Sequence, residues 1–489
     1  MRIENIKKFK LFPDLKWFLI ASVIGILVAQ ILPAGDILTS RGTTFIGVFV
    51  ACIILFCAAQ DQMMASIFAI VTMAVFCHED FMGLATNALI NTAVIYTFGG
   101  FILAHAMTKS GMTEYIAKWF MSRDGIKGHP YAYLAAATAA FAVIAILTFS
   151  AFTLVLLTAL CSSALNKAGI EKGTPIYKAN MLVFLWITPW AELAIPYGKP
   201  LALACLAYCQ QYGVPIDYFS YMKISIPLFI AFVLVIFIVV RLFIRPKAED
   251  ISGYDPQVLR KEMLEIKLSK RSKFSLAMVL LTFALMVLQG VASIPFVSTH
   301  IIQWGAAAYF IPIVLLCLIP FDGEPALNLK KDINQLNYPI LFFLAAVMMF
   351  SGYIGKEEYG LSAWLISVFT PLNELLSPVG MMAVAVIATV ILTNFISNFV
   401  AMAISVSIFT PVMAALYGSG ASIFSPALTI ILVVFAANIS CLVPSSCFGA
   451  AFLYGGFLKV KNSFISNIAL LVLGTALLIV GGFALVRLF

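Results

Sequence analysis

The sequence predicts an all-α polytopic membrane protein with about eleven transmembrane helices, two re-entrant hairpins and an inverted repeat. Three observations favour this fold class. Of the 489 residues, 62% are hydrophobic and 11% are charged, which is more apolar surface than a soluble chain can bury. Many apolar runs approach the ~20 residues that cross a bilayer as a helix. Similar segments recur in the two halves of the chain and run in opposite directions.

The apolar runs divide into eleven membrane-crossing helices and two longer stretches. The helices are predicted near residues 17–33, 43–59, 62–77, 89–110, 177–209, 222–244, 274–294, 299–319, 336–357, 426–455 and 464–488. The stretches 131–165 and 378–413 are too long for one crossing and too short for two crossings with a loop. We therefore expect each of them to form a re-entrant hairpin that returns to the side it came from.

The basic residues indicate the orientation. With the N-terminus in the cytoplasm and both hairpins re-entrant, nearly all of the 30 Lys and Arg fall on the cytoplasmic side. The exceptions are Arg41, Lys223, Lys356 and Arg487 outside, and Lys199 in between. Topology thus explains the net charge of +8, and we expect no nucleic-acid partner. The Lys-rich N-terminal stretch lacks a convincing cleavage site, so we expect it to be retained in a multi-pass protein of the cytoplasmic (inner) membrane.

Cysteine and histidine give no sign of a metal site or of catalysis. The nine cysteines lie in or beside apolar segments without a CxxC pair, so we interpret them as small buried apolar residues. The four histidines are scattered along the chain. A membrane-embedded enzyme would need a catalytic set near the membrane interface, and we therefore expect no enzyme activity.

A polar interval at 245–273 divides the chain near its middle. Its "DPQVLRKEMLEIKL" part has the spacing of an amphipathic helix, and we interpret the interval as a cytoplasmic linker along the membrane surface. "YTFGGFILAHAMTKSGMTEYIAKW" (96–119) precedes the first hairpin stretch, and "LFFLAAVMMFSGYIGKEEYGLSAWL" (341–365) precedes the second. Matching segments of opposite direction form an inverted repeat. Together with interrupted helices in both halves, this repeat indicates a secondary transporter with its site near the midplane.

Each half contains one helix broken at membrane depth. The breaks are "PYGKP" (196–200) and "PSSCFG" (444–449). Non-helical backbone is tolerated at this depth only where it is buried in protein or lines a wet cavity. A kink without function is the alternative at either break. Two breaks at corresponding places favour a binding site, because half-helix N-termini direct partial positive charge at an anion.

The centres of both hairpin stretches are polar. They contain Thr148, Ser150 and Thr153 in the first stretch, and Thr393, Asn394, Ser397 and Asn398 in the second. Isolated Ser and Thr side chains often bond back to their own helix. Buried asparagine needs several partners, so a ligand, an ion or a facing backbone must supply them.

Glu192 and Lys199 flank the first break, some ~20 Å or more into the membrane if the helix were unbroken. A charged residue at this depth is costly, so we take a functional role as the first hypothesis for it. One interpretation is a structural ion pair, since seven residues make two helical turns. The other is that Lys199 supplies positive charge to an anionic substrate, with Glu192 balancing it in the empty site. Either group is then a candidate carrier of a coupling proton.

At these motifs the chain resembles the divalent-anion/sodium symporters, a family within the ion-transporter superfamily. The resemblance covers nearly the whole chain. Segment 96–119 is similar to that family's glycine-rich helix, and "SNF" (397–399) to its Ser-Asn-Thr hairpin tip. "IPYGKPLA" (195–202) and "VPSSCFGA" (443–450) fall where the family has its two breaks.

The resemblance implies an elevator-type transporter, in which hairpins and broken helices slide against a dimeric scaffold. Scaffold helices would lie in 1–130 and 274–377, transport-domain halves in 131–244 and 378–489, and the linker in 245–273. The implied substrate-binding residues are Ser150, Thr153, Gly198, Lys199, Ser397, Asn398, Ser445 and Ser446. The implied coupling residues are Glu192, Lys199 and Asn398. The expected partners are a small anionic substrate, the bilayer and a second copy of the chain. No cofactor is expected beyond sodium or a proton as the coupling ion.

The chain departs from that family's pattern at both tips and both breaks. The departures are Ser150-Ala151-Phe152 and Phe399 at the tips, Lys199 and Ala202 at the first break, and Cys447 and Ala450 at the second. We therefore expect Lys199 to replace one sodium ion in a transporter of di- or tricarboxylate-like anions. The alternatives are a conventional sodium-coupled dicarboxylate or sulfate symporter and an anion channel. A channel would need a continuous polar pore, which the clustered polar residues do not suggest. Whether Phe152 and Phe399 contact the substrate stays open.

Overall fold

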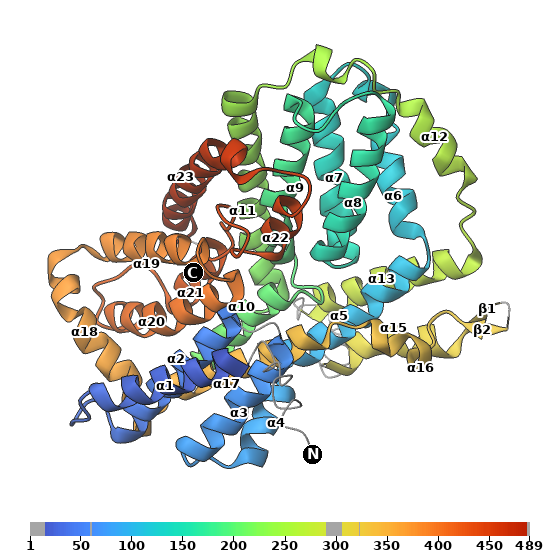
Figure 1. Ribbon diagram of the computed structural model, residues 1–489. Coiled ribbons are helices and arrows are strands. Elements are labelled where there is room, and N and C mark those ends of the chain that lie inside the picture. The colour runs from blue at the N-terminus through green and yellow to red at the C-terminus, as the bar shows by residue number, and fades with distance from the viewer. Residues whose placement is uncertain (1–14, 59–60, 290–305, 322, 487–489) are drawn as a thin grey trace, which may run out of the picture.

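The computed structural model describes residues 15–58, 61–289, 306–321 and 323–486 (Figure 1). These residues are almost entirely helical, with one small antiparallel pair formed by β1 (Pro320–Phe321) and β2 (Glu324–Pro325). The Lys-rich N-terminal stretch, Arg487 and parts of the helices predicted near 274–294 and 299–319 lie outside the described residues.

The first half of the chain builds a set of outer helices, then a hairpin and a broken helix. The outer helices are α1 (Leu15–Ile31), α2 (Ser40–Ala58), α3 (Gln62–Phe76), α4 (Phe81–Leu89), α5 (Thr92–Lys109) and α6 (Met112–Met121), followed by the short η2 (Asp124–Ile126). The first hairpin is α7 (Pro130–Leu147) and α8 (Ser150–Lys167). The broken helix is α9 (Pro175–Ala194) and α10 (Pro200–Gln211), and α11 (Tyr218–Val239) with η3 (Val240–Ile244) follows.

The second half repeats this order after the linker helices η4 (Ala248–Ile251) and α12 (Pro256–Glu265). Its outer helices are α13 (Lys270–Gln289), α15 (Ala306–Leu318), α16 (Leu329–Asp332), η6 (Ile333–Gln335), α17 (Tyr338–Ile354), η7 (Glu357–Tyr359) and α18 (Leu361–Leu375). The second hairpin is α19 (Pro378–Thr393) and α20 (Asn398–Gly418). The second broken helix is α21 (Pro426–Ala436) and α22 (Phe448–Tyr454), and α23 (Val460–Leu485) ends the described chain.

Both predicted hairpins and both predicted broken helices are present as helical structures. Seven helices are long and apolar enough to cross a membrane, or up to nine if each bent pair is one span, among the described residues. The bent pairs are α4 with α5, at 48°, and α16–η6 with α17, at 69°. They occupy equivalent places in the two halves, as the inverted repeat requires. The predicted number of eleven crossings and the re-entrant placement of the hairpins stay predictions.

The helices α4, α6 and α18 were not predicted, because each of them is too short to cross a membrane. Both α6 and α18 begin directly after a glycine with positive φ, Gly111 at 73° and Gly360 at 67°. The left-handed glycine turns the chain sharply at the end of α5 or η7. Each helix therefore leads from an outer helix into a hairpin.

The broken helices lie at the centre of the molecule. Nearly every residue of α9, α10 and α21 is buried, whereas most residues of α11 and α23 are partly buried or exposed. The Trp190 ring of α9 stacks on Phe232 of α11 at a centroid distance of 3.7 Å. Protein on all sides of α9, α10 and α21 makes non-helical backbone tolerable at membrane depth.

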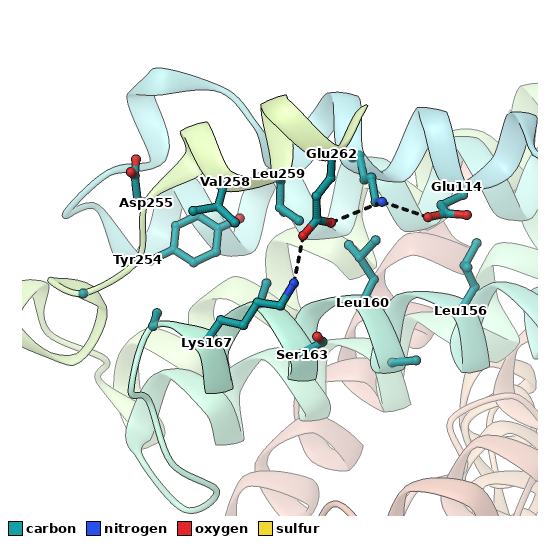
Figure 2. Close-up of a pocket in the computed structure, with 15 residues that line it drawn as sticks. Glu114, Leu156, Leu160, Ser163, Lys167, Tyr254, Asp255, Val258, Leu259 and Glu262 are labelled. Carbon is teal, nitrogen blue, oxygen red and sulfur yellow. Dashed lines mark hydrogen bonds and ion pairs between the residues drawn. The ribbon is translucent and has the colours of Figure 1, made fainter. Parts of the chain in front are cut away.

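The linker helix α12 forms, as its amphipathic spacing predicted, and packs on both α6 and α8. Glu262 of α12 makes ion pairs with Lys167 (2.8 Å) and Lys118 (3.2 Å), and Lys118 also pairs with Glu114 (2.8 Å). Figure 2 shows Leu259 directed into the same hollow, which has a volume of about 310 Å³. The linker is therefore tied to the first hairpin and to α6 through Glu262.

Candidate functional site

The two hairpin tips and the two breaks converge on one small cavity of about 130 Å³. Its walls come from both tips, α9, the start of α10, the start of α22 and the start of α17. The lining residues are Phe149, Ala151, Thr188, Pro189, Glu192, Leu201, Asn337, Ile340, Asn398, Phe399, Cys447, Phe448 and Gly449. The sequence prediction that tips and breaks form one site is thus supported by their positions in the fold.

The first tip is a two-residue turn, Thr148-Phe149, between α7 and α8. The Thr148 hydroxyl donates to the Ile144 carbonyl (2.8 Å) and shares a hydrogen bond with the Thr153 hydroxyl (3.1 Å). The Ser150 hydroxyl at the start of α8 is fully buried and has no partner among the described residues. Thr153 is therefore occupied within its own hairpin, and Ser150 is free to accept a new partner.

The second tip is bound to the second break by Asn394. The Asn394 side-chain amide donates to the carbonyls of Val390 and Ile439, both at 2.8 Å. Its oxygen accepts hydrogen bonds from the backbone N–H groups of Cys441 (2.9 Å) and Leu442 (3.0 Å). Facing backbone thus supplies the partners that the sequence required for this asparagine. The second break consequently spans 437–447, earlier than the predicted 444–449, because these bonds stabilise the unwound chain after α21.

Asn398 lines the cavity and is held by a second amide, Asn438. The Asn398 Nδ2 donates to the Asn438 Oδ1 (2.8 Å), while the Asn438 Nδ2 donates to the Val434 carbonyl (2.7 Å). The backbone N–H of Asn398 donates to the Ser446 carbonyl (3.2 Å). The position of Asn398 is therefore fixed from both sides. Asn438 was not predicted, because it lies before the break expected at 444–449.

The three predicted serines of this half lie around the cavity rather than on its wall. Ser397 is the residue before α20 and makes no capping hydrogen bond. Ser445 is exposed and donates to the Phe395 carbonyl (3.3 Å), and the buried Ser446 hydroxyl donates to the Val443 carbonyl (2.7 Å). Cys447 takes the capping position, where its Sγ accepts from the Ala450 N–H (3.4 Å).

The first break brings Gly198 against a glycine of α5. Gly198 has a left-handed φ of 58°, and a Cβ added there would lie 2.5 Å from the Gly100 Cα and 2.9 Å from the Tyr309 hydroxyl. Only glycine fits this crossing of two backbones. Gly198 therefore joins the first break to the outer helices and does not line the cavity, contrary to its predicted place at the substrate.

Lys199 follows Gly198 and caps the first hairpin. Its side chain is 1% exposed, and its Nζ donates to the carbonyl of Ala145, near the end of α7. This carbonyl is among the last four of its helix, which have no partner within the helix. The negative end of α7 also favours a cation. The ammonium therefore fills a place beside the first tip, next to the cavity wall but not in it.

Glu192 does line the cavity, and it makes no hydrogen bond or ion pair in the part of the chain that the structure describes. The helix α9 ends at Ala194, so the seven-residue separation no longer places Glu192 and Lys199 on one helical face. The structural ion pair that was the other interpretation of these two residues is absent from the contacts of the described residues. Both charges lie at the unfavourable ends of their own helices, so helix stability does not explain them.

The chain matches the model of a family described as citrate transporters over residues 31–408. The match covers most of the chain, from the end of α1 into α20, and includes the first break and both tips. The chain belongs to the citrate transporter family. This is a family of transporters, so the expectation that the chain is not an enzyme is confirmed, as is its membrane location.

One solved structure with a similar fold is that of the YdaH transporter of Alcanivorax borkumensis. It aligns over 96% of each chain with a TM-score of 0.52 and 12% identity. At this identity the likeness concerns the fold alone, and it extends over the second break, which the family match does not reach. No curated protein matches the sequence significantly.

Of the predicted site residues, the structure places Glu192 and Asn398 on the cavity wall of this citrate transporter family member. Ser150, Thr153, Lys199, Ser397, Ser445 and Ser446 lie in the surrounding tips and breaks. Asn337 and Thr188 also line the cavity and were missed. Thr188 stands alone among apolar residues, and Asn337 follows a polar stretch at the start of α17, so neither belongs to a predicted tip or break. Phe399 lines the cavity, and Phe152 is not among its lining residues.

Proposed function

We propose that this protein is a secondary active transporter that carries small organic anions of the di- or tricarboxylate class across the cytoplasmic membrane, with its N-terminus inside. The convergence of two hairpin tips and two broken helices on one cavity carries the proposal. Membership of the citrate transporter family supports a carboxylate substrate. The Asn337 and Asn398 amides are the candidate hydrogen-bond donors to its oxygens, because the Thr188 hydroxyl already donates to the Phe184 carbonyl.

We further propose an elevator mechanism in a homodimer, as in the divalent-anion/sodium symporters that the sequence resembles. The moving part would contain both hairpins with α9–α11 and α21–α23, and the remaining outer helices would form the scaffold. Two features support this division. The cavity lies between α17 and the hairpin and break elements. The backbones of Gly100 and Gly198 are in close contact, so no side chains interlock where the two parts meet at this point.

Coupling is proposed to be independent of sodium. The Lys199 ammonium binds the free carbonyl of Ala145 and carries the same +1 charge as a sodium ion. At the second break, the side-chain oxygens of Asn394, Asn398 and Asn438 each accept a hydrogen bond from the protein. These contacts support the view that groups of the protein take the place of sodium at both positions where the divalent-anion/sodium symporters bind it.

Glu192 is the proposed carrier of a coupling proton. An ionised carboxylate in an enclosed site without a donor is costly, and an incoming carboxylate would add repulsion. Protonation of Glu192 as the anion enters removes both penalties. This linkage predicts anion–proton symport. If Glu192 keeps its proton throughout the cycle, the protein would instead exchange one anion for another.

The test is citrate uptake into proteoliposomes with sodium replaced by choline and an inward proton gradient applied. We expect accumulation without sodium that collapses with a protonophore. A strict sodium requirement with a Hill slope above one would instead favour a conventional sodium symporter. Preloaded citrate should accelerate uptake by counterflow, which distinguishes a carrier from an anion channel. Competition by dicarboxylates, tricarboxylates and sulfate then defines the substrate.

A further inference from the structure

A second cavity lies where α11 ends, away from the transport site. Its volume is about 410 Å³. It is lined by Tyr131 from the start of α7 and by Arg241, Leu242, Arg245, Pro246 and Lys247 from the end of α11 and the chain beyond it. Three of these six residues are cationic, and the transport mechanism uses none of them.

The backbone at this end of α11 has an unusual conformation that gathers the cations. The last turn, η3, is a π-helix, and Arg245 after it has φ 54° and ψ 54°, a left-handed conformation that favours glycine. The Nε of Arg245 donates to the Leu242 carbonyl (2.8 Å), which holds the guanidinium against the turn. An arginine at a position suited to glycine is costly, so its side chain is expected to have a use.

The three cations form no ion pair with an acidic side chain of the described residues. Among the described ion pairs, none joins Arg241, Arg245 or Lys247 to a carboxylate. Asp250 is close in sequence, but its carboxylate accepts a hydrogen bond from the backbone N–H of Lys247 (2.7 Å). The Arg241 guanidinium lies over the Tyr131 ring, 5.4 Å from its centroid. The cavity is therefore strongly positive and complementary to an anion.

An apolar stripe on α11 leads into this cavity. Its members are spaced four residues apart on one helical face and are exposed: Ile230 (54%), Leu234 (60%), Ile238 (49%) and Leu242 (49%). Leu242 belongs both to the stripe and to the cavity wall. The helix is long and apolar enough to cross a membrane, so the stripe faces acyl chains. The orientation predicted from the charges places the cavity at the cytoplasmic surface.

We propose that this cavity binds the phosphate headgroup of an anionic phospholipid, whose acyl chains lie along the stripe of α11. A basic pocket at the cytoplasmic end of a membrane helix is suited to such headgroups. The general bias of Lys and Arg toward the cytoplasmic side explains why cations lie at this end of α11. It does not explain why they share a cavity with an aromatic ring and an apolar stripe. The stripe favours a lipid over a free phosphate, which has no apolar part.

The test uses the full-length protein in detergent and native mass spectrometry with phosphatidylglycerol and phosphatidylcholine. We expect a preference for phosphatidylglycerol that falls about a hundredfold in the triple variant R241Q/R245Q/K247Q. The matched control K261Q/K267Q/K270Q removes the same charge from exposed linker lysines and should keep the preference. The variant R241K/R245K keeps the positive charge and should keep most of the preference for phosphatidylglycerol. This result would show that substitutions at these positions leave folding and membrane insertion intact.

Two results would overturn the proposal. In the first, the triple variant retains phosphatidylglycerol as the wild type does. In the second, inorganic phosphate displaces phosphatidylglycerol at concentrations comparable to those of the lipid, so that the cavity binds free anions. Because lipid retention is measured without transport, neither result depends on the proposed function.

Discussion

Lys199 donates a hydrogen bond from its Nζ to the carbonyl oxygen of Ala145, and so joins the start of α10 to the end of α7. A sodium ion in this place would bind the same kind of oxygen and would leave in each transport cycle. An ammonium group tethered to the chain stays there throughout the cycle. Under the proposed mechanism the positive charge would move with the protein in both directions, and a sodium gradient would supply no driving force at this position.

Lys199→Met should weaken anion binding and leave the first tip without its cation. Removal of a unit charge close to an anion in partly desolvated surroundings should raise the citrate Kd about tenfold or more. Isothermal titration in detergent measures the Kd, and uptake in choline buffer measures transport. Lys461→Met, at an exposed position on α23, is the control and should be neutral. Wild-type citrate affinity in Lys199→Met would show that Lys199 does not serve the substrate.

Glu192→Gln should separate exchange from proton-driven uptake. Glutamine has nearly the shape of a protonated glutamate, so the cavity should still accept the anion. The variant has no proton to carry, and accumulation driven by a proton gradient should be lost. Counterflow of citrate should stay within about twofold of the wild type, because exchange needs no net proton movement. Continued proton-driven accumulation in this variant would exclude Glu192 as the carrier.

Much of the fold could be predicted from the sequence, because apolar runs and proline–glycine breaks carry strong physical signals. The hairpins, the broken helices and the repeated order of elements in the two halves are such features. The helices α4, α6 and α18 could not be predicted in this way, since each is shorter than the apolar run that a membrane crossing needs. The length of the second break depends on Asn394, whose partners Ile439, Cys441 and Leu442 are 45 to 48 residues away in the sequence.

The site was predicted as a region more accurately than as a set of residues. The predicted tips and breaks surround the cavity, as expected where irregular backbone in a membrane must line protein or water. Local pattern does not show which side chains face the cavity. Glu192 faces it and Lys199 does not, because the break at 195–199 changes the direction of the chain between them. Asn337 comes from another part of the fold, which only tertiary structure reveals.

Asn394→Ala should destabilise the protein strongly without touching the cavity charges. The change leaves two N–H groups, of Cys441 and Leu442, and two carbonyls, of Val390 and Ile439, without the partner they now have. Each buried group left unpaired costs roughly 1–3 kcal/mol, so the loss should exceed about 3 kcal/mol. Thermal unfolding in detergent should show a lower Tm. Asn87→Ala, on the exposed face of α4, is the matched control. An unchanged Tm would mean that water replaces the amide at the second break.

Glu262→Gln should release the linker helix α12 from α6 and α8. The ion pairs with Lys167 and then with Lys118 hold the pKa of the Glu262 carboxyl below its ordinary value of 4.5. Because the pKa in the folded state is lowered, the contribution of Glu262 is present at neutral pH and is lost as pH falls through that lower pKa. Limited trypsin digestion within 245–273 measures the release. We expect faster cleavage in the variant at pH 7, while the neighbouring Glu265→Gln, at an exposed position of the same helix, should be cleaved as the wild type is. Equal cleavage of all three proteins would show that Leu259 and its apolar contacts hold α12 in place without the ion pairs.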